Sequence, residues 1–516
     1  MKTNKILLLI ASIFLLASCG GSKGGGGSSE EGMGAFVSAS ATYGEDNSII
    51  YGDKVNKEDF TFSLQYENQT ITASPRDFDL SLSVDSTFTN DKFNATLTLK
   101  SDPTIQATVE LTPKVRESLK LLFIGNSFSD DTIQWMYEIA TDLGIEVVIE
   151  NMYIGGCSID THYSNIINDK PAYQWVHRVN NSWVRTSNYT LAEAIVGQDW
   201  DFISFQQSSG VSGIPSSYGN LSNLLEEVEF YLIDSDHTQY VWNMTWAYQG
   251  DSTHSDFSRY NNNQTTMYNA ICSTVQSEVL TLDNIATVIP NGTAIQNART
   301  SYVGDHLTRD GYHLSNDLGR YIAGMNALKT LTGVDVDPCR YSTVNKSQTL
   351  IAKESVNNSQ ISKFNVTLSE YINDPMSLEE IKKTHHLRIN QIQRGYYNAT
   401  DASHPSSVIF RDGNSFDKQF ACTEIIPTEE FVDGVIIYIK SGYKYRPEAW
   451  RSLTSTIDSR PPLTQTTFTE VNAAWRSDYS YRAFNVSRTD SAQLTDQEIA
   501  DIASGEIFAI YLPNDS

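Results

Sequence analysis

The sequence predicts an α/β domain in the middle of the chain, with a β-sandwich domain on each side of it. Three observations lead to this prediction. Residues 117–335 alternate apolar runs of strand length with helical patterns. Residues 35–115 and 385–516 instead alternate apolar and polar residues at strand spacing. With 516 residues, the chain is also too long for one typical domain.

The N-terminus has the pattern of an export signal followed by a tether. Two lysines precede an apolar stretch, Ile6–Leu16, which is too short to span a bilayer. The next residues, Leu-Ala-Ser-Cys19, resemble a bacterial lipobox, and this resemblance implies cleavage before Cys19 and lipidation of its thiol. We therefore expect a signal peptide at 1–18, a flexible Gly/Ser-rich tether at 19–34, and anchoring to the bacterial cell envelope on its periplasmic or cell-surface face. An ordinary secretory signal is the alternative.

The chain is strongly acidic, with 62 Asp and Glu against 37 Lys and Arg and a net charge of −25. Such a surface disfavours nucleic acid and anionic membranes as partners. It suits neutral or poorly charged ligands, including sugars, but it is explained equally well by solubility alone. The only membrane contact that we expect is the lipid at Cys19.

Four cysteines remain after the lipobox: Cys157, Cys272, Cys339 and Cys422. They are far apart and form no CxxC pair, so they suggest neither a zinc site nor a redox motif. Outside the cytoplasm a disulfide is an alternative that the sequence does not pair, and we expect buried free thiols for most of the four and no metal.

The predicted N-terminal sandwich, 35–115, contains four alternating segments separated by Asn, Asp, Ser and Pro. Its stretch Tyr51–Phe60 resembles the bacterial immunoglobulin-like modules that serve as spacers. Nothing in this domain has a catalytic pattern.

The region after the α/β domain divides into a predicted helix and linker at 341–384 and a C-terminal β-sandwich at 385–516. Two of its segments, Tyr443–Trp450 and Trp475–Tyr481, are rich in aromatic residues that are able to stack on sugar rings. Packing of these aromatics in the core is the more common role. Carbohydrate binding by this domain is therefore a hypothesis.

Residues 116–340 form the predicted α/β domain. Its predicted strands are Leu119–Ile124, Glu146–Glu150, Phe202–Gln206, Tyr240–Asn243 and Thr287–Pro290. Its predicted helices lie near Thr132–Leu143, Asn220–Ile233, Tyr260–Val279 and Leu318–Leu331. An insertion, Tyr173–Thr186, has the pattern of a hairpin that turns at Asn180-Asn181. Right-handed crossovers would cover both faces of a parallel sheet with these helices.

Ser127 lies where the first predicted strand of this domain passes into a helix. The apolar run Leu119–Ile124 stops at Gly125, and the helical pattern starts a few residues later. In a parallel sheet this turn lies at the carboxyl end of the strand, where such folds bind their ligands. A serine at this position becomes a nucleophile only with a base, a group that orients the base, and donors for an oxyanion.

A base for Ser127 is available near the end of the domain. Asp310 and His313 are three residues apart, just before the last predicted helix. At this spacing the carboxylate is able to accept the Nδ1 hydrogen of the histidine, which leaves Nε2 for Ser127. His306 is the competing base, but it has no carboxylate three residues before it, so we favour His313 and expect Asp305 and His306 to shape the loop.

The order of these blocks resembles the SGNH hydrolases, also called GDSL-type hydrolases. The likeness covers about residues 117–335: Gly125-Asn126-Ser127 after a strand, a glycine turn after the second strand, and Asp310-Gly-Tyr-His313 before the final helix. It implies a flavodoxin-like three-layer α/β/α fold and a serine esterase that needs no cofactor. It also implies Ser127 as the nucleophile, His313 as the base and Asp310 as the residue that orients the base.

The resemblance also implies an oxyanion hole, and here the sequence departs from the family. The backbone N–H of Ser127 and that of Gly155 or Gly156 match two donors. The family usually adds an Asn side chain after the third strand, where this chain has Gln206 and Gln207. A Gln amide is able to supply the same N–H group, and because neighbouring strand residues point to opposite faces, at most one of the two should do so. Asn126, where Asp is common, should alter the hydrogen bonding of the turn more than the chemistry.

Two aromatic residues, Trp246 and Tyr248, follow the fourth predicted strand and are candidates for the wall of a sugar-binding site. Burial explains them about equally well.

We therefore expect a lipid-anchored, extracytoplasmic serine esterase that hydrolyses acyl esters, most simply acetyl esters, on carbohydrate or another small substrate. One alternative is a lipase-like or thioesterase-like hydrolase that uses the same three residues. The other is a surface lipoprotein that binds glycans without catalysis, as the glutamines and the aromatic-rich C-terminal domain suggest.

Overall fold

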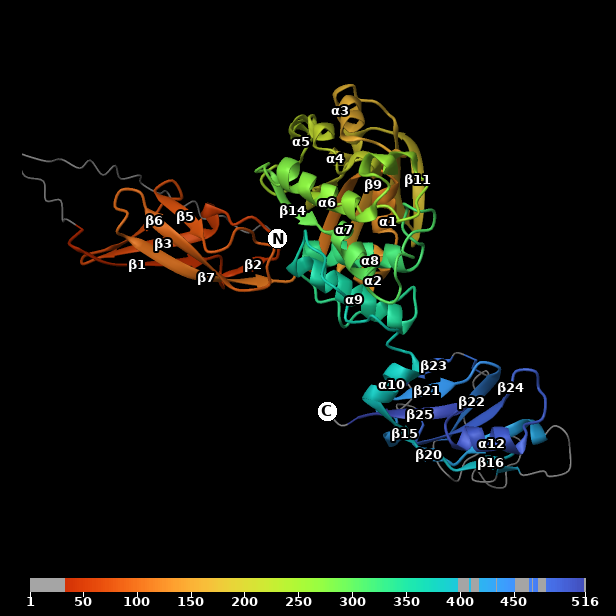
Figure 1. Ribbon diagram of the computed structural model, residues 1–516. Coiled ribbons are helices and arrows are strands. Elements are labelled where there is room, and N and C mark those ends of the chain that lie inside the picture. The colour runs from red at the N-terminus through yellow and green to blue at the C-terminus, as the bar shows by residue number, and fades with distance from the viewer. Residues whose placement is uncertain are drawn as a thin grey trace, which may run out of the picture. The chain divides into compact units, whose positions relative to one another are not determined.

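The computed structural model describes residues 33–397, 408–409, 417–432, 434–450, 464–465, 467–471 and 479–514. The predicted signal peptide, Cys19 and most of the predicted tether lie outside these residues, as does Trp475. None of the helices in the described chain combines the length and apolar character needed to cross a bilayer. The chain forms two compact units (Figure 1): one takes the described part of residues 1–49 with 55–85 and 91–112, and the other takes 50–54, 86–90 and the described residues from 113 onward.

The strands between residues 36 and 114 form two antiparallel sheets. One has the order β1-β3-β4 and the other β2-β7-β6-β5. Their bounds are β1 Phe36–Tyr43, β2 Ser48–Ile50, β3 Phe60–Tyr66, β4 Thr70–Ala73, β5 Phe78–Leu82, β6 Phe93–Leu99 and β7 Gln106–Lys114. Alternate residues of these strands, such as Phe62, Leu64 and Leu97, are buried in one shared core, as the alternating pattern predicted.

A mixed seven-stranded sheet forms the centre of the region described between residues 118 and 289, in the order β11-β10-β9-β8-β12-β13-β14. Its bounds are β8 Ser118–Gly125, β9 Glu146–Tyr153, β10 Tyr173–Val179, β11 Ser182–Tyr189, β12 Phe202–Phe205, β13 Gln239–Asn243 and β14 Ile285–Ile289. Five neighbouring strands, β9, β8, β12, β13 and β14, run parallel to one another. All five were predicted from the sequence.

The strand order predicts where a crevice lies in the sheet. If the parallel strands β8, β9, β12, β13 and β14 are numbered 1 to 5, their order across the sheet is 2-1-3-4-5. The connections that follow β8 and β12 therefore cross opposite faces of the sheet. A crevice forms at such a switch point, outside the carboxyl ends of the strands. Register pairs Ile124 of β8 with Phe205 of β12, so the residues that follow both strands meet at this edge.

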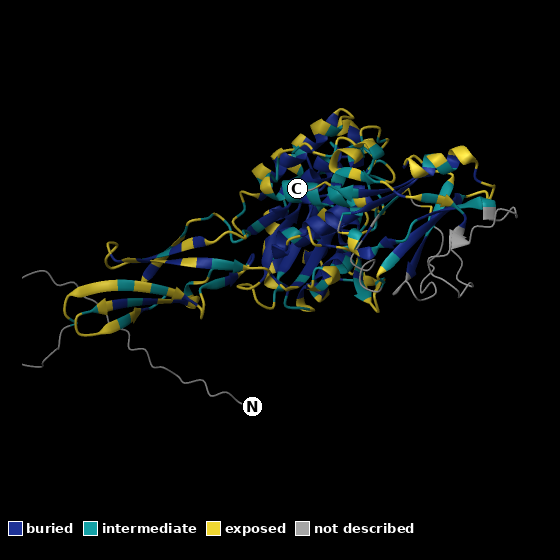
Figure 2. Ribbon diagram, turned by 90° about the horizontal axis from the view of Figure 1, so that it is seen from below, coloured by how far each residue is buried: buried dark blue, intermediate teal, exposed yellow. Residues whose placement is uncertain are grey.

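Helices cover both faces of the sheet (Figure 1). One group packs around α8 and contains α1 Ser127–Ile133, α2 Met136–Asp142, α7 Asn291–Ala298, α8 Leu318–Thr332 and α9 Lys346–Ile361. The other contains α3 Ile159–Ile167, α4 Leu191–Val196, α5 Leu221–Phe230 and α6 Gln264–Thr274. Figure 2 shows that the buried residues concentrate in the sheet and on the helix faces that contact it.

Two helical regions differ from the sequence prediction. The helix expected near Thr132–Leu143 begins earlier, because the side chain of Asn126 caps α1 by accepting the backbone N–H of Phe128, and the helical segment consists of two helices, α1 and α2. Helix α9 lies in the segment predicted as helix plus linker, and it buries Ile351 and Val356 in the core of the α/β region. A short helix, α10 Leu378–Thr384, follows it.

Three further antiparallel sheets lie in the described part of residues 385–514: one in the order β15-β25-β21-β23, one in the order β16-β19-β24-β20 with β22 also paired to β24, and a two-stranded sheet of β17 and β18. The main strands are β15 His385–Arg388, β16 Ile392–Arg394, β19 Phe420–Thr423, β20 Ile426–Pro427, β21 Ile436–Ile439, β22 Tyr443–Trp450, β23 Phe468–Glu470, β24 Tyr481–Arg488 and β25 Phe508–Pro513. The two-stranded sheet consists of β17 Tyr396–Tyr397 and β18 Val408–Ile409, and helix α12 spans Asp496–Ala503. Tyr445, from the aromatic-rich segment, is buried in the core.

The predicted hairpin is present, and its turn yields the first prediction. Asn180 and Asn181 have φ of 48° and 63°, the left-handed conformation that a two-residue hairpin turn requires. Replacing Asn181 by Val should destabilise the turn by about 1–2 kcal/mol, since branched residues avoid this conformation. Asn181→Gly is the matched control and should melt at or above the temperature of the parent protein. Equal thermal midpoints for the Val and Gly variants would contradict the prediction.

Candidate active site

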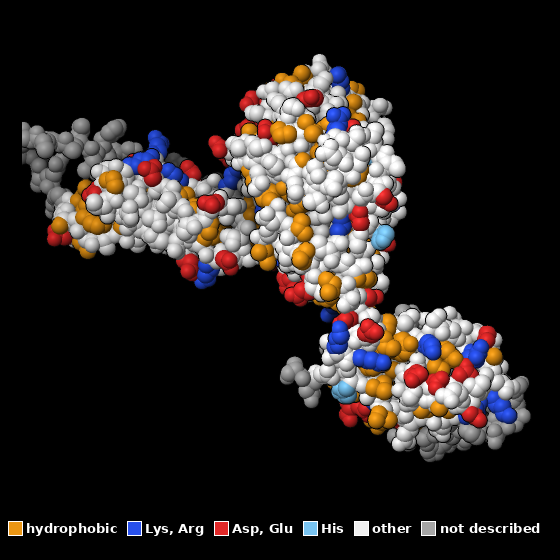
Figure 3. All heavy atoms as spheres, in the orientation of Figure 1, with side chains coloured by type: hydrophobic (Ala, Val, Ile, Leu, Met, Phe, Trp, Pro, Cys, Tyr) orange, Lys and Arg blue, Asp and Glu red, His pale blue; other side chains and the backbone are white. Residues whose placement is uncertain are grey.

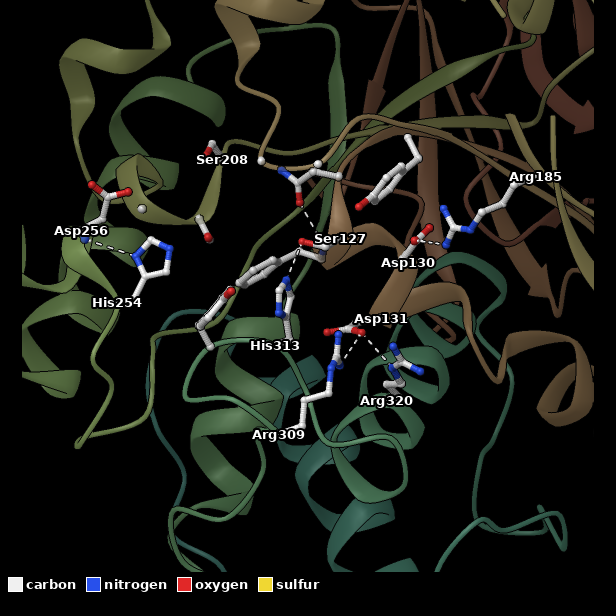
Figure 4. Close-up of a pocket in the computed structure, with 18 residues that line it drawn as sticks. Ser127, Asp130, Asp131, Arg185, Ser208, His254, Asp256, Arg309, His313 and Arg320 are labelled. Carbon is white, nitrogen blue, oxygen red and sulfur yellow. Dashed lines mark hydrogen bonds and ion pairs between the residues drawn. The ribbon is translucent and has the colours of Figure 1, made fainter. Parts of the chain in front are cut away.

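A cavity of about 610 Å³ lies at the carboxyl ends of β8, β9 and β12 (Figure 4). Its walls come from the turn after β8, the glycine turn after β9, the segment after β12, the hairpin, and the loops before η4 (Ser255–Tyr260) and α8. The lining residues are Asn126, Ser127, Phe128, Asp130, Asp131, Tyr153, Gly155, Gly156, Arg185, Ser208, Ser209, Gly210, His254, Asp256, Arg309, Tyr312, His313 and Arg320.

Ser127 is the first residue of α1. The turn before it, Gly125-Asn126, accepts few other residues. A Cβ on Gly125 would come within 2.4 Å of Ser129 Oγ, so glycine is required at the end of β8. Asn126 then caps the helix from its extended conformation. Together these two residues direct the side chain of Ser127 into the cavity.

His313 and Asp310 meet Ser127 in one chain of hydrogen bonds. His313 Nε2 lies 2.8 Å from Ser127 Oγ, and His313 Nδ1 lies 2.7 Å from Asp310 Oδ2. The backbone N–H of His313 also donates to Asp310 Oδ1 at 2.8 Å, which fixes the carboxylate in the loop. Partial burial raises the pKa of Asp310, but hydrogen bonds from His313 and Tyr312 outweigh it and hold that pKa below its usual value. Asp310 therefore stays ionised.

The carboxylate of Asp131 joins α1 to the loop that carries His313. Its side chain is fully buried, and it forms ion pairs with Arg309 Nη1 at 2.9 Å and Arg320 Nε at 2.8 Å. It also accepts the backbone N–H of Leu314 at 2.8 Å, next to His313. Asp131 is one helical turn from Ser127, so the same face of α1 presents both the hydroxyl and the anchor of the histidine loop.

The competing histidine lies elsewhere. His306 is exposed and does not line the cavity. Its neighbour Asp305 forms an ion pair with Arg299 at 2.8 Å and accepts the backbone N–H of Gly250 at 2.7 Å, which holds the loop in shape.

The glycine turn after β9 lies beside Ser127 at the cavity wall. Gly155 and Gly156 both line the cavity, and Gly156 has a φ of 65°, which disfavours any other residue. The next residue, Cys157, is buried as a free thiol, and burial raises its pKa to about 12. The thiol therefore stays protonated at neutral pH.

Neither glutamine side chain lines the cavity. Gln206 Nε2 donates to Asn126 Oδ1 at 2.7 Å, whereas Gln207 Nε2 donates to the backbone and hydroxyl oxygens of Ser217 at 2.7 and 3.1 Å. Both residues are 1% exposed. The expectation that one of these amides faces the oxyanion is therefore not met, because other acceptors lie within reach of each amide inside the domain. Ser208, the next residue, does line the cavity.

Trp246 and Tyr248 are fully buried behind the cavity wall instead of forming it. Trp246 stacks on Phe128 with ring centroids 4.4 Å apart and donates to the backbone carbonyl of Tyr312 at 2.8 Å. The hydroxyl of Tyr248 lies 2.9 Å from Ser209 Oγ. Both residues thus support side chains that do line the cavity, and neither is a wall residue.

Two pairs of polar residues at the cavity were not predicted from the sequence. Figure 4 shows these pairs on opposite sides of Ser127. On one side Arg185 of β11 forms an ion pair with Asp130 and lies over the ring of Tyr153 at 4.8 Å. Burial raises the pKa of Asp130 even though Arg185 and Asn151 donate to it. The sequence signal for this group was weak: Asp130 follows Ser127 by three residues, but Arg185 comes from the inserted hairpin.

On the other side, His254 and Asp256 line the cavity. His254 Nδ1 accepts the backbone N–H of Asp256 at 3.2 Å, so a neutral ring carries its hydrogen on Nε2 and acts there as a donor. The ring lies 4.7 Å from that of Tyr312, which in turn lies 4.2 Å from that of His313. No local pattern in the sequence marks this loop.

The comparisons place this region in a family. A model of a domain of unknown function, DUF4886, matches residues 120–359. A solved DUF4886 family protein from Bacteroides uniformis is 37% identical over 48% of this chain and 97% of that chain, with a TM-score of 0.47. The chain belongs to the DUF4886 family.

The DUF4886 region is also similar to other solved structures at low identity. An acetylxylan esterase from Geobacillus stearothermophilus is 12% identical, over 45% of this chain and 99% of that chain, with a TM-score of 0.27. A protein from Desulfitobacterium hafniense, described as lipolytic and of the G-D-S-L family, is 15% identical, over 41% of this chain and 99% of that chain, with a TM-score of 0.26. No curated protein matches the chain.

The arrangement has the parts of a proton-transfer system. The hydroxyl of Ser127 is hydrogen-bonded to an imidazole, a carboxylate orients that imidazole, and backbone N–H groups border the same space. In the described chain, His, Cys, Asp and Glu side chains do not come together in threes that could share a metal ion.

The buried ion pairs of Asp131 lead to a stability prediction. Asp131→Asn removes the charge that pairs with Arg309 and Arg320, so it should cost on the order of 3 kcal/mol and lower the thermal midpoint of the DUF4886 region by about 6–12 °C. The control is Asp256→Asn, which removes the more exposed ion pair with Arg259 and should cost less than about 1 kcal/mol. A midpoint for Asp131→Asn within the range of the control would contradict the anchoring role.

Proposed function

We propose that the DUF4886 domain of this chain is a serine ester hydrolase with Ser127 as nucleophile, His313 as base and Asp310 as the residue that orients the base. The observation that carries the proposal is the hydrogen-bond chain from Asp310 through His313 to Ser127, with both distances below 3 Å, at the wall of an open cavity. The strand order of the sheet also supports the flavodoxin-like SGNH relationship that the sequence motifs suggest.

The reaction follows from these positions. Ser127 Oγ attacks the ester carbonyl while His313 Nε2 accepts its proton, and Asp310 stabilises the imidazolium that forms. The backbone N–H of Ser127, with that of Gly155 or Gly156, donates to the oxyanion. When the tetrahedral intermediate collapses, His313 returns the proton to the leaving alcohol, and the acyl group remains on Ser127. Water then gives a proton to His313 and attacks the acyl-enzyme, which releases the acid and restores the serine.

The lining of the cavity favours a short acyl group on a polyhydroxylated alcohol. Phe128, Tyr153 and Tyr312 supply its aromatic surface, and Leu, Ile, Val and Met are absent from the described lining residues. The remaining side chains are hydrogen-bond donors and acceptors, which match hydroxyl groups and leave a long acyl chain without an apolar surface. We therefore propose acetyl esters of carbohydrates as the substrate class and consider the lipase-like alternative less compatible with this lining.

We also propose that the protein is exported and lipid-anchored through Cys19. The support is the N-terminal pattern alone: a basic start, a short apolar stretch and the Leu-Ala-Ser-Cys19 sequence. An acylated carbohydrate outside the cytoplasm would then be within reach of the enzyme.

The role of Ser127 is tested by Ser127→Ala, which should abolish the release of p-nitrophenol from p-nitrophenyl acetate. A fluorophosphonate probe should label the parent protein and not the variant, because labelling requires an activated hydroxyl. The control is Ser209→Ala, which removes a hydroxyl at the same cavity and should remain labelled. Equal hydrolysis by Ser127→Ala and its parent would remove the nucleophile assignment. Absence of both hydrolysis and labelling in the parent would favour a non-catalytic protein.

The substrate class is tested with p-nitrophenyl esters of increasing chain length and with acetylated polysaccharides. We expect kcat/KM to fall from acetate to octanoate by about tenfold or more, because a longer acyl chain would cover polar side chains of the cavity without replacing their hydrogen bonds with water. Free acetate should be released from an acetylated polysaccharide. A rise in kcat/KM with chain length would instead select the lipase-like reading.

A further inference from the structure

A continuous chain of buried amide side chains leads from α9 to the turn that carries Ser127. Its members are at most 1% exposed, except Gln360, which is half-buried. The hydrogen bonds run from Ser359 and Gln360 to Asn326 (3.0 and 2.6 Å), then to Asn291 (3.0 Å), Asn243 (2.9 Å), Gln206 (2.9 Å), Asn126 (2.7 Å) and finally the backbone carbonyl of Cys157 (3.1 Å).

All the donors in this amide chain point in the same direction. Each side chain accepts a hydrogen bond on its oxygen and donates the next one from its nitrogen. Aligned hydrogen bonds in a dry interior polarise one another, so each bond strengthens the next. The last donor of the amide chain is Asn126, and its acceptor belongs to Cys157, which directly follows the glycine turn at the cavity wall.

Asn126 joins the two backbone segments that border the hydroxyl of Ser127. Its Oδ1 accepts the N–H of Phe128 at 3.0 Å, which sets the first turn of α1. Its Nδ2 donates to the carbonyl of Cys157 at 3.1 Å, which sets the position of Gly155 and Gly156. Gln206 holds the amide of Asn126 in the orientation that permits both bonds.

This geometry explains why asparagine stands at position 126. An aspartate would keep the bonds from Phe128 and Gln206, but its second oxygen would face the carbonyl of Cys157 without a hydrogen between them. The two backbone segments would then separate. Gln206 is likewise matched to Asn126, since a carboxylate at 206 could accept from Asn243 but could not donate to Asn126.

We propose that Asn126 and Gln206 are positioning residues that hold the backbone N–H groups of Ser127 and of the glycine turn at the spacing an oxyanion requires. The proposal rests on the proposed esterase function. Both residues act through the backbone: Asn126 joins the two segments, and Gln206 orients Asn126. Gln206 thus contributes to the oxyanion site indirectly, in contrast to the direct donor role for which Gln206 and Gln207 were the two candidates.

Asn126→Asp tests the proposal with almost no change in volume. We expect kcat for p-nitrophenyl acetate to fall by about 10- to 100-fold with KM changed less than about threefold, because misplaced donors weaken binding of the transition state most. Asn297→Asp is the matched control, since Asn297 is 1% exposed and its Nδ2 faces the carbonyl of Ser355 at 3.4 Å, away from the cavity. It should lower the thermal midpoint but leave kcat unchanged. Equal kcat in the two variants would overturn the proposal.

A double-mutant cycle tests whether Gln206 acts through Asn126. Gln206→Ala should lower kcat, and adding it to Asn126→Ala should lower kcat no further. Independent, multiplicative losses would overturn this link. If an alanine variant does not fold, Gln206→Glu replaces it and should reduce kcat with little change in KM. Ser127→Ala, measured in parallel, distinguishes failure of the esterase function from failure of the positioning role. Retained activity in Ser127→Ala rejects the esterase function. If Ser127→Ala is inactive but Asn126→Asp keeps the kcat of the parent, only the positioning role is rejected.

Discussion

The buried carboxylate of Asp131 determines how two distant parts of the chain meet. Helix α1 carries Ser127 and Asp131 on one face, and Asp131 holds the backbone next to His313 together with Arg309 and Arg320. Burying a carboxylate is costly, and the two guanidinium groups and a backbone N–H offset that cost only in this one arrangement. The distance between hydroxyl and imidazole is therefore set by a packed ion-pair cluster, although the histidine itself is on a loop.

Local patterns in the sequence predicted the parallel strands and the meeting of Ser127 with His313 and Asp310. The strand at Leu119–Ile124 is a short apolar run, and Asp310 and His313 are close enough in sequence for their hydrogen bond to be local. Arg185 and His254 could not be predicted in this way, because they reach the cavity from a hairpin and from a loop without repeating patterns. Contacts between such segments depend on the whole fold and leave no signal at fixed spacing.

The amide chain shows why the glutamines and α9 were harder to interpret. Pattern reading assumes that inward-facing positions are apolar. Helix α9 instead turns Ser359 and Gln360 toward Asn326, so polar residues share its inward face with Ile351 and Val356. Gln206 and Gln207 were the two candidates for one oxyanion donor because they stand at the end of the third strand, but Gln206 donates to Asn126 inside the domain instead. A row of buried polar side chains is costly unless each one is hydrogen-bonded. In this amide chain, each side chain finds its acceptor in the next member of the chain.

The chemistry of the hydroxyl and imidazole does not by itself select a substrate, because a lipase and a sugar esterase need the same proton transfers. In our proposal, the pairs of polar residues on the two sides of Ser127 determine which substrate is accepted. Asp130 with Arg185, and Asp256 with His254, each combine an acceptor with a donor. On the face seen in Figure 3, acidic and basic side chains likewise lie among one another. A fatty acyl chain that covered these two pairs of residues would displace the water bound to them and could not replace the hydrogen bonds of that water. The cost is about 1–3 kcal/mol for each polar group left unpaired. Sugar hydroxyls replace those bonds, since each one donates and accepts. The proposed preference for a polyhydroxylated ester thus rests on the penalty that these two pairs would impose on an apolar substrate.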